Sequence, residues 1–160
     1  MMGMGHFYAL IGAAIAILLS GVGSAIGVGR AGQAASALMS KDPTKFGNAM
    51  VLQLLPSSQG LYGFVVAFIM LVKLNVLGGP VADVTVQQGI ALLCLCLPIA
   101  IVGFVSAITQ GMVVVSGINL LGKQEKQVGH AILFAVMVEI FAIFALIVSL
   151  LGVLLLPIGA

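Results

Sequence analysis

The residues of this chain best suited to chemistry begin with one carboxylate in an apolar setting. Glu139 is the only acidic residue of the run HAILFAVMVEIFAIFALIVSLL. A carboxylate at the centre of a bilayer costs about 2.5–3.5 kcal/mol on insertion scales unless a cation or a proton neutralises it. Intramembrane carboxylates usually mark ion or proton pathways. Glu139 is therefore the first candidate for an ion-carrying group.

An amide is predicted to lie beside this carboxylate. Gln110 precedes the middle of the charged segment GKQEK by about as many residues as Glu139 follows it. In an antiparallel helical hairpin such residues lie side by side, in this case about 18 Å into the helices at about 1.5 Å per residue. The spacing thus predicts a contact between Gln110 and Glu139.

A third polar group occurs in the segment LQLLPSSQGLYG. Its members are spaced at three and four residues and share one helix face: Leu55, Ser58, Gln59 and Tyr62. Pro56 lacks a backbone N–H and can leave a carbonyl free to meet a cation. Contacts between helices, with Pro56 as a simple kink, would also suit these residues. Their depth, similar to that of Glu139, favours an ion site.

The elements that must position these groups follow from composition. The chain is 62% hydrophobic and has six basic and four acidic side chains, whereas soluble domains carry about 25% charged residues. Four long segments are uncharged apart from Glu139: residues 1–29, 46–72, 84–122 and 127–160. Each exceeds the roughly 20 apolar residues that a membrane-spanning helix needs. We predict an all-α membrane protein with four transmembrane helices, and no basic patch that would bind nucleic acid.

The two halves of the chain repeat each other at an offset of 82 residues. The triplet Ser-Ala-Ile at 24–26 recurs at 106–108, and Gly47 matches Gly129. A constant offset indicates duplication of a two-helix unit. We expect a first hairpin over residues 1–80, with helices at about 7–40 and 44–74, and a second over residues 81–160, with helices at about 84–122 and 126–156.

The repeat also identifies what distinguishes the second half. The position equivalent to Glu139 is Ser57, and the position equivalent to Gln110 is Val28. Only the second half therefore carries the carboxylate and the amide. Closely spaced glycines in the first helix, in the segment GVGSAIGVG, predict close helix packing at an inner position of a tight ring.

The basic residues predict the orientation of the chain in a cell membrane. They gather in the connections between helices 1 and 2 and between helices 3 and 4: Lys41, Lys45, Lys123 and Lys126, with Arg30 near the end of the first helix. The second connection has only Lys73, accompanied by Asp83. The positive-inside rule then places connections 1–2 and 3–4 in the cytoplasm and both termini outside.

These motifs closely resemble those of the membrane rotor proteolipids of V-type rotary ATPases, the c-type or K subunits, and specifically the bacterial sodium-translocating kind. The resemblance covers essentially the whole chain and rests on four segments: GVGSAIGVG, LQLLPSSQGLYGF, SAITQG and AVMVEIFAI. It implies a ring of identical copies that turns in lipid against a stator subunit with an essential membrane arginine. Central-stalk subunits are the other implied partners. The chain itself would have no catalytic site, because a soluble head hydrolyses the ATP.

Matched by position, the resemblance implies a sodium site with five contributors: the Glu139 carboxylate, the side-chain oxygens of Gln110 and Gln59, the Ser58 hydroxyl and the Leu55 carbonyl. Tyr62 would donate a hydrogen bond to Glu139. Position 58 departs from the family's sodium-binding pattern, which has Thr, but the hydroxyl is retained. Ser57 replaces a family Gly and is expected to point away from the site.

The number of oxygen donors favours sodium as the transported ion. A proton carrier needs only a carboxylate whose pKa is raised by apolar surroundings. A hard cation must replace its water with several oxygens, and this chain offers about five at one depth. A proton-carrying rotor, a small four-helix ion-coupled transporter and a purely structural four-helix protein remain as alternatives.

Overall fold

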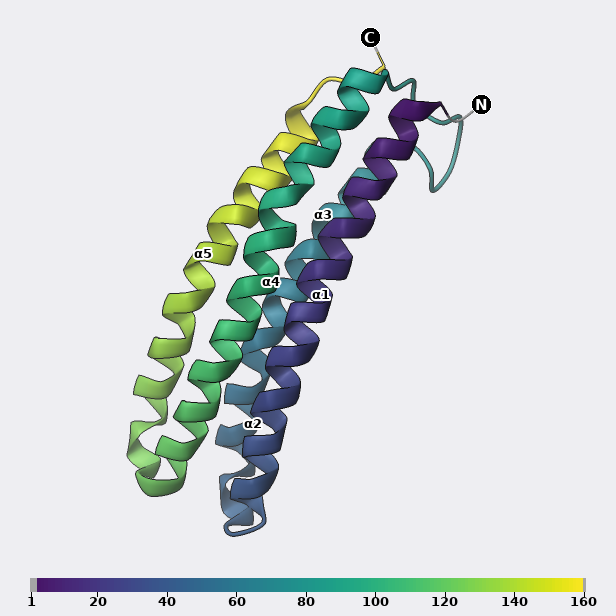
Figure 1. Cartoon of the computed structure of the whole chain (residues 1–160). Coiled ribbons are helices and arrows are strands. Elements are labelled where there is room, and N and C mark those ends of the chain that lie inside the picture. The colour runs from purple at the N-terminus through teal and green to yellow at the C-terminus, as the bar shows by residue number, and fades with distance from the viewer. Residues whose placement is uncertain (1–2, 160) are drawn as a thin grey trace.

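The computed structural model describes residues 3–159, and this part of the chain is entirely helical outside its connections (Figure 1). The long helices are α1 (Met4–Met39), α2 (Phe46–Leu54), α3 (Ser58–Lys73), α4 (Val86–Lys123) and α5 (Val128–Leu155). Three short 3-10 turns separate some of them: η1 (Pro43–Lys45), η2 (Leu55–Ser57) and η3 (Glu125–Gln127). Four segments are long and apolar enough to cross a membrane, as predicted: Met4–Met39, Pro43–Lys73, Val86–Lys123 and Glu125–Leu155.

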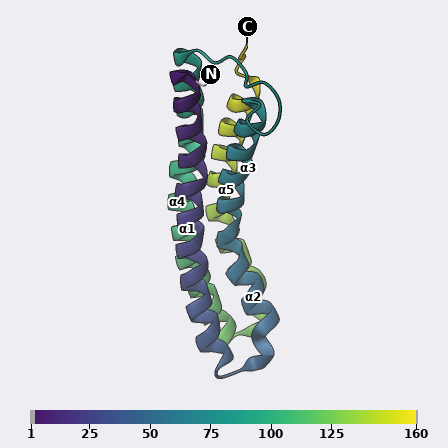
Figure 2. The ribbon, with the colours of Figure 1, turned by 90° about the vertical axis from the view of Figure 1, so that its right-hand side faces the viewer.

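The helices form a long bundle of two layers. Figure 2 shows α1 and α4 side by side in one layer, and α2, α3 and α5 in the other. Both ends of the described chain lie at the same end of the bundle as the connection between α3 and α4 (Figure 1). The two short connections lie at the opposite end. The equivalent helices α1 and α4 therefore run parallel, as expected for a repeat whose halves share one orientation.

The seam between α1 and α4 is the most extensive helix contact in the bundle. Glycines make it possible because their backbones touch the facing helix. A Cβ atom at Gly23 would lie 2.6 Å from the Phe104 carbonyl oxygen, and one at Gly111 would lie 2.5 Å from Cα of Gly27. Such distances are too short for any side chain. The predicted role in close packing is thus confirmed for Gly23 and Gly27, whose partner is the equivalent helix of the other half, but not for Gly21 and Gly29, where a Cβ atom would meet no other atom within 4 Å.

The buried core is divided by depth into three parts. One apolar cluster, which includes Met70 and Leu92, occupies the half of the bundle near the chain ends. A second, which includes Leu52 and Ile118, occupies the half near the short connections. Between them in depth lie buried polar side chains: Ser24, Gln59, Ser106 and Gln110. A polar layer in the middle of an apolar bundle is costly unless its groups are hydrogen-bonded.

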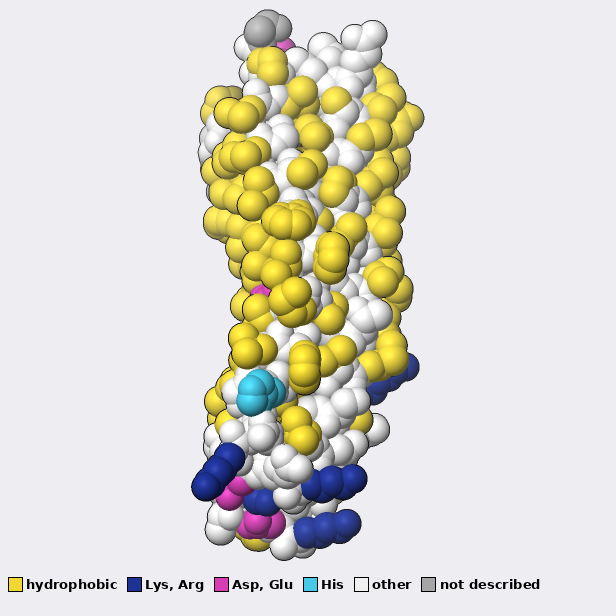
Figure 3. All heavy atoms as spheres, turned by 90° about the vertical axis from the view of Figure 1, so that its left-hand side faces the viewer, with side chains coloured by type: hydrophobic (Ala, Val, Ile, Leu, Met, Phe, Trp, Pro, Cys, Tyr) yellow, Lys and Arg dark blue, Asp and Glu magenta, His cyan; other side chains and the backbone are white. Residues whose placement is uncertain are grey.

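The outer surface suits a lipid environment. The face in Figure 3 is covered by hydrophobic side chains over most of its length, and most of its charged groups gather at the end with the short connections. On α5, large apolar side chains such as Phe134, Met137 and Phe141 are more than half exposed. The chain is therefore a multi-pass membrane protein by its surface as well as by its helix lengths.

The helix ends depart by a few residues from the predicted ones, for local reasons. The first helix starts at Met4 rather than about residue 7, where the Gly3 amide donates to the His6 ring at 3.2 Å. The third starts at Val86 rather than 84, because Thr85 and Gln88 form a reciprocal capping box. The span predicted at about 44–74 contains the turn η2, which divides it into α2 and α3.

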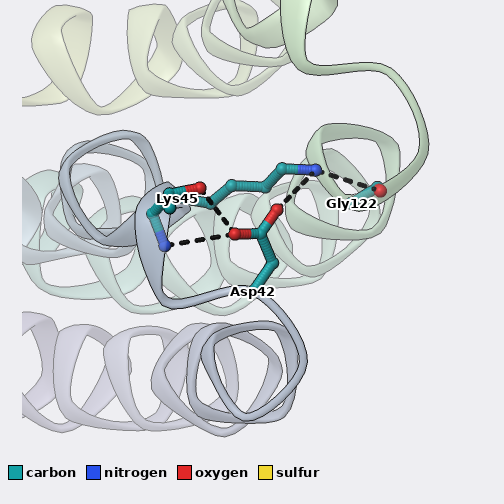
Figure 4. A network of polar contacts seen from close by, with 4 residues as sticks. Asp42, Lys45 and Gly122 are labelled. Atoms are coloured by element: carbon teal, nitrogen blue, oxygen red, sulfur yellow. Dashed lines mark hydrogen bonds and ion pairs between the residues drawn. The ribbon is translucent and has the colours of Figure 1, made fainter.

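At the end with the short connections, one ionic network links the two halves (Figure 4). The Lys45 ammonium lies 3.4 Å from the Asp42 carboxylate and donates at 3.3 Å to the Gly122 carbonyl at the end of α4. A cation at a helix C-terminus is favoured by the helix dipole. Asp42 also caps η1, and the Thr44 hydroxyl that donates to its carboxylate lowers the Asp42 pKa. The first connection is thereby held against α4.

Candidate functional site

The interruption in the second span is the element that builds the site. Pro56 has no N–H to donate toward Leu52, and the chain forms a 3-10 turn over Leu55–Ser57 before α3 begins. The Leu55 carbonyl then accepts from both the backbone N–H and the hydroxyl of Ser58, the latter at 3.0 Å. The turn brings a backbone carbonyl and a hydroxyl together at mid-depth. Pro56 thus disturbs the local hydrogen bonding as predicted, but the Leu55 carbonyl is not left free, because both donors of Ser58 bond to it.

Two fully buried amides connect this turn to α4. Gln59 Nε2 donates to Gln110 Oε1 at 2.7 Å, and both side chains have no exposed surface. Gln110 Nε2 in turn donates to the Ala135 carbonyl of α5 at 3.0 Å. Ser58 completes the chain by donating to Gln59 Oε1 at 3.3 Å. Helices α3, α4 and α5 are thus joined by one continuous hydrogen-bonded network.

Glu139 lies at the end of this network and is half-buried. Tyr62 donates to one carboxylate oxygen at 2.6 Å, and Gln110 Nε2 approaches the other at 3.4 Å. The predicted contact between Gln110 and Glu139 is therefore confirmed, as is the expected hydrogen bond from Tyr62. Within residues 3–159 the ion pair between Lys45 and Asp42 is the only one, so no basic side chain of this part of the chain neutralises Glu139.

The arrangement is rich in oxygen. Six oxygens of a single chain belong to it: both carboxylate oxygens of Glu139, the side-chain oxygens of Gln110 and Gln59, the Ser58 hydroxyl and the Leu55 carbonyl. They come from the five residues that the resemblance implied as ligands. Oxygens of this kind suit a hard cation such as Na⁺. Their role as ligands stays a prediction.

Two residues that contribute hydrogen bonds at or beside the site were not predicted from the sequence. The Ala135 carbonyl is a backbone group, and nothing in its residue type distinguishes it. The second is Ser24 of α1, whose hydroxyl oxygen accepts a hydrogen bond from the Gly60 amide at 2.8 Å. The sequence singled out Ser24 only as part of the repeated triplet Ser-Ala-Ile. The position expected to point away from the site, Ser57, donates backward to the Leu54 carbonyl at 2.6 Å.

Comparison with known proteins agrees with the duplicated plan. The family model for the C subunit of ATP synthase matches residues 11–70 and again residues 93–152, so the second match begins and ends 82 residues after the first. This equals the offset found within the sequence. Both matches include the mid-depth polar residues of their half.

Individual relatives give the same picture. The chain is 45% identical over 150 residues to the V-type sodium ATPase subunit K of Enterococcus hirae, covering 94% of this chain and 92% of that protein. It is 35% identical over 141 residues to the A-type ATP synthase subunit K of Methanocaldococcus jannaschii, covering 88% of this chain and 59% of that protein. The human 16 kDa proteolipid of the V-type proton ATPase is 24% identical over 144 residues, with coverage of 90% and 89%.

Proposed function

This chain belongs to the family of the ATP synthase C subunit, which matches both of its halves, and from that premise we propose that it is the ion-carrying rotor-ring subunit of a V-type rotary ATPase that moves Na⁺ across the membrane. Hydrolysis of ATP by other subunits drives the transport, and this chain contributes no catalytic site. The observation that carries the proposal is the oxygen-rich network around Glu139, the only acidic residue in helices α1 to α5. The sodium ATPase subunit of Enterococcus hirae, at 45% identity, supports the choice of ion.

In the proposed site, Na⁺ is the cargo, and five residues supply its oxygen ligands: Glu139, Gln110, Gln59, Ser58 and, through its backbone carbonyl, Leu55. Tyr62 holds the Glu139 carboxylate in place through its hydroxyl. Because these ligands come from α3, α4, α5 and η2, the site lies within one copy of the chain. The hydrogen bonds that already join these groups support their common role, since little reorganisation is needed to gather them.

Rotation follows from the electrostatics of Glu139. An occupied site is effectively neutral, so the loaded subunit passes through lipid at low cost. When the subunit reaches the stator, a membrane arginine pairs with the carboxylate and the cation leaves. An empty, charged site is tolerable only beside that arginine. The subunit must therefore bind another ion before it returns to the lipid. This coupling makes ion movement and ring rotation one process.

The duplication has an energetic consequence for the pump. Each copy has four spanning helices but one carboxylate, because Ser57 stands at the position equivalent to Glu139. A ring of a given size therefore carries fewer ions per turn, and each ion receives a larger share of the energy of hydrolysis. This favours ATP-driven pumping against a steep gradient over ATP synthesis.

The assembly and its orientation complete the proposal. Residues 1–80 and 81–160 form the two hairpin units, and identical copies make a ring embedded in lipid. The basic connections face the cytoplasm and the central-stalk subunits, while both chain ends face outward. We place the glycine-rich seam of α1 and α4 on the inner side of the ring, where tight packing is needed most, and the close approach of these two helices supports that position.

The test is chemical labelling of Glu139 in membranes that contain the assembled complex. A carbodiimide attacks a protonated carboxyl group, and a bound Na⁺ prevents that protonation. We expect millimolar NaCl to slow the labelling of Glu139, whereas KCl at the same concentration does not. The variant Glu139→Gln, which cannot be labelled there, identifies the modified residue.

Two results would contradict the proposal. Labelling that is indifferent to Na⁺ but slows as pH rises would indicate a proton carrier, the ion named in the human relative. The native mass of the detergent-extracted protein tests the ring separately. A monomer or dimer under conditions that preserve other membrane complexes would exclude a rotor and favour a small stand-alone transporter.

A further inference from the structure

The first turn of α3 lacks a local cap. Helix α3 begins at Ser58, and the preceding residue Ser57 makes no side-chain cap hydrogen bond to it. The Ser57 hydroxyl donates in the other direction, to the Leu54 carbonyl. The first N–H groups of a helix have no partner within the helix and need an acceptor from elsewhere. In the membrane, water cannot supply one.

A side chain from another helix supplies this acceptor. The Gly60 amide, in the first turn of α3, donates to the Ser24 hydroxyl oxygen of α1 at 2.8 Å. Ser24 is buried, with 7% of its surface exposed. An N-cap serine normally precedes its own helix in the chain. Here the capping serine comes from 36 residues earlier and from the other layer of the bundle.

Close contact between the two helices makes this hydrogen bond possible. A Cβ atom at Gly60 would lie 3.2 Å from both Cβ and Oγ of Ser24, and 3.5 Å from Cα of Gly21. A larger residue at position 60 would push Ser24 away. The neighbouring turn is seated in the same way, since a Cβ atom at Gly27 would lie 2.9 Å from Cβ of Pro56. Helix α1 thus serves as a platform for η2 and the start of α3.

The capped turn is the one that carries the site. Ser58 and Gln59 directly precede Gly60, and Tyr62 follows within the next half turn. Gln59 must reach Gln110 on α4, and Tyr62 must reach Glu139 on α5. Rotation or fraying of the first turn of α3 would displace all of these groups together. The Ser24 hydroxyl on α1 therefore helps to position the site residues, although it is not one of the site's oxygen donors.

The second half provides an internal comparison. Its equivalent serine, Ser106, donates to the Gly103 carbonyl of its own helix at 3.3 Å. The residue equivalent to Gly60 is Ala142, which lies inside the continuous helix α5 and has a helical acceptor for its amide. The same repeated serine thus makes an inter-helix cap only where the facing helix is interrupted.

We infer that Ser24 is a positioning residue for the ion site: it caps α3 from α1 and holds Ser58, Gln59 and Tyr62 in the geometry that binds the cation. This inference rests on the proposed function. It adds a residue outside the set of ligands and assigns the first helix a part in ion affinity.

The experiment compares Ser24→Ala with Ser106→Ala in membranes that contain the assembled complex. The measured quantity is the NaCl concentration that halves the rate of carbodiimide labelling of Glu139. We expect Ser24→Ala to raise it roughly fivefold, in line with the loss of one buried hydrogen bond. The labelling rate without Na⁺ should rise as well, because Tyr62, which donates to Glu139, is displaced together with the turn. Ser106→Ala should leave both quantities unchanged, and Ser24→Thr, which keeps the hydroxyl, should restore the wild-type value.

A second measurement separates the cap from the ion. Hydrogen–deuterium exchange of the peptide that contains Gly60 should be faster in Ser24→Ala and in Gly60→Ala than in wild type, and unchanged in Ser106→Ala. An unchanged half-protecting NaCl concentration in Ser24→Ala, or an equal rise in Ser106→Ala, would overturn the inference. Wild-type labelling that ignores Na⁺ would instead contradict the proposed function, and unchanged exchange at Gly60 would then refute the cap independently.

Discussion

The two halves of this chain share one plan but use their prolines differently. Pro56 interrupts the outer helix of the first half and produces the turn η2. Pro98 lies inside α4 of the second half, and the helix continues through it. In both halves a serine from another helix accepts a nearby amide: Ser24 from Gly60 at 2.8 Å, and Ser149 from Ile99 at 3.2 Å. Each of the two prolines within the bundle, Pro56 and Pro98, thus has a serine hydroxyl from another helix close by.

What makes only one of these places a candidate ion site is the chemistry of the neighbouring side chains. The turn at Pro56 faces Gln110 and Glu139 through Gln59 and Tyr62. Beside Pro98 the buried polar side chain is Ser149, a neutral hydroxyl, and the adjacent Ile99 is fully buried. A helix irregularity frees or redirects backbone groups, but a cation also needs a carboxylate to balance its charge. The duplicated scaffold supplies the irregularity, and the second half alone supplies the charge.

The largest expected effect comes from substitution at position 139, where the second half has a carboxylate and the first half has Ser57. Replacing the carboxylate by Glu139→Gln should abolish Na⁺ uptake into vesicles and carbodiimide labelling, because helices α1 to α5 contain no other acidic residue. The equivalent change in the first half, Ser57→Ala, should leave transport near the wild-type rate. Equal loss in both variants would show that the halves do not divide the work in this way.

A smaller but still large effect is expected from making the second half resemble the first at Gln110. The variant Gln110→Val introduces the residue found at Val28 and leaves the buried Gln59 amide without its partner. An unpaired buried polar group costs about 1–3 kcal/mol. We expect a lower midpoint of thermal unfolding in detergent and at least a tenfold weaker protection of Glu139 by Na⁺. Thr109→Val, which removes a half-buried hydroxyl one residue away, should change neither measurement appreciably.

The converse exchange at Tyr62 should have a moderate effect. Its equivalent in the second half is Phe144, so Tyr62→Phe keeps the ring and removes only the hydroxyl that donates to Glu139 at 2.6 Å. Loss of a hydrogen bond to a charged group costs about 1.5–3 kcal/mol. We expect the carboxylate to accept carbodiimide faster, and Na⁺ to protect it less. A labelling rate equal to that of the wild type would show that Tyr62 does not hold Glu139 in place.

The smallest expected effect concerns the connections. Asp42 caps η1, whereas its equivalent Gln124 makes no side-chain cap in η3. The Thr44 hydroxyl, which donates to the Asp42 carboxylate, lowers the pKa of this group from its ordinary value of 3.8. A lowered pKa stabilises the folded state above that ordinary value, and the contribution is lost as the pH falls through the lowered pKa.

Asp42→Asn should therefore lower the thermal midpoint slightly at pH 7, and the difference from wild type should shrink as the pH is brought below about 4. Glu125→Gln, in the connection without such a cap, is the matched control and should lower the thermal midpoint at pH 7 less than Asp42→Asn does. A difference for Asp42→Asn that is the same at both pH values would contradict a role for the charged carboxylate.

Much of the bundle could be predicted because membrane insertion is governed by properties that run along the chain. Four uncharged segments, a repeat offset of 82 residues and the equal depths of Gln110 and Glu139 are all visible in the order of the residues. The contact between those two side chains followed from depth alone. The helix boundaries at Met4 and Val86 were harder to predict, because they depend on capping hydrogen bonds made by His6 and Gln88.

The residue types and their spacing were sufficient to predict the four spans, the duplication and the contact between Gln110 and Glu139, since hydropathy and helical rise are properties of each residue in turn. Only the tertiary structure decided which residues of neighbouring helices contact each other. Three contacts depend on how each helix is rotated about its axis and on which helix faces it. They are the glycine seam between α1 and α4, the hydrogen bond from Gln59 to Gln110, and the hydrogen bond by which Ser24 caps α3 at Gly60. That rotation is set by steric fit between segments far apart in the chain, which no local pattern records.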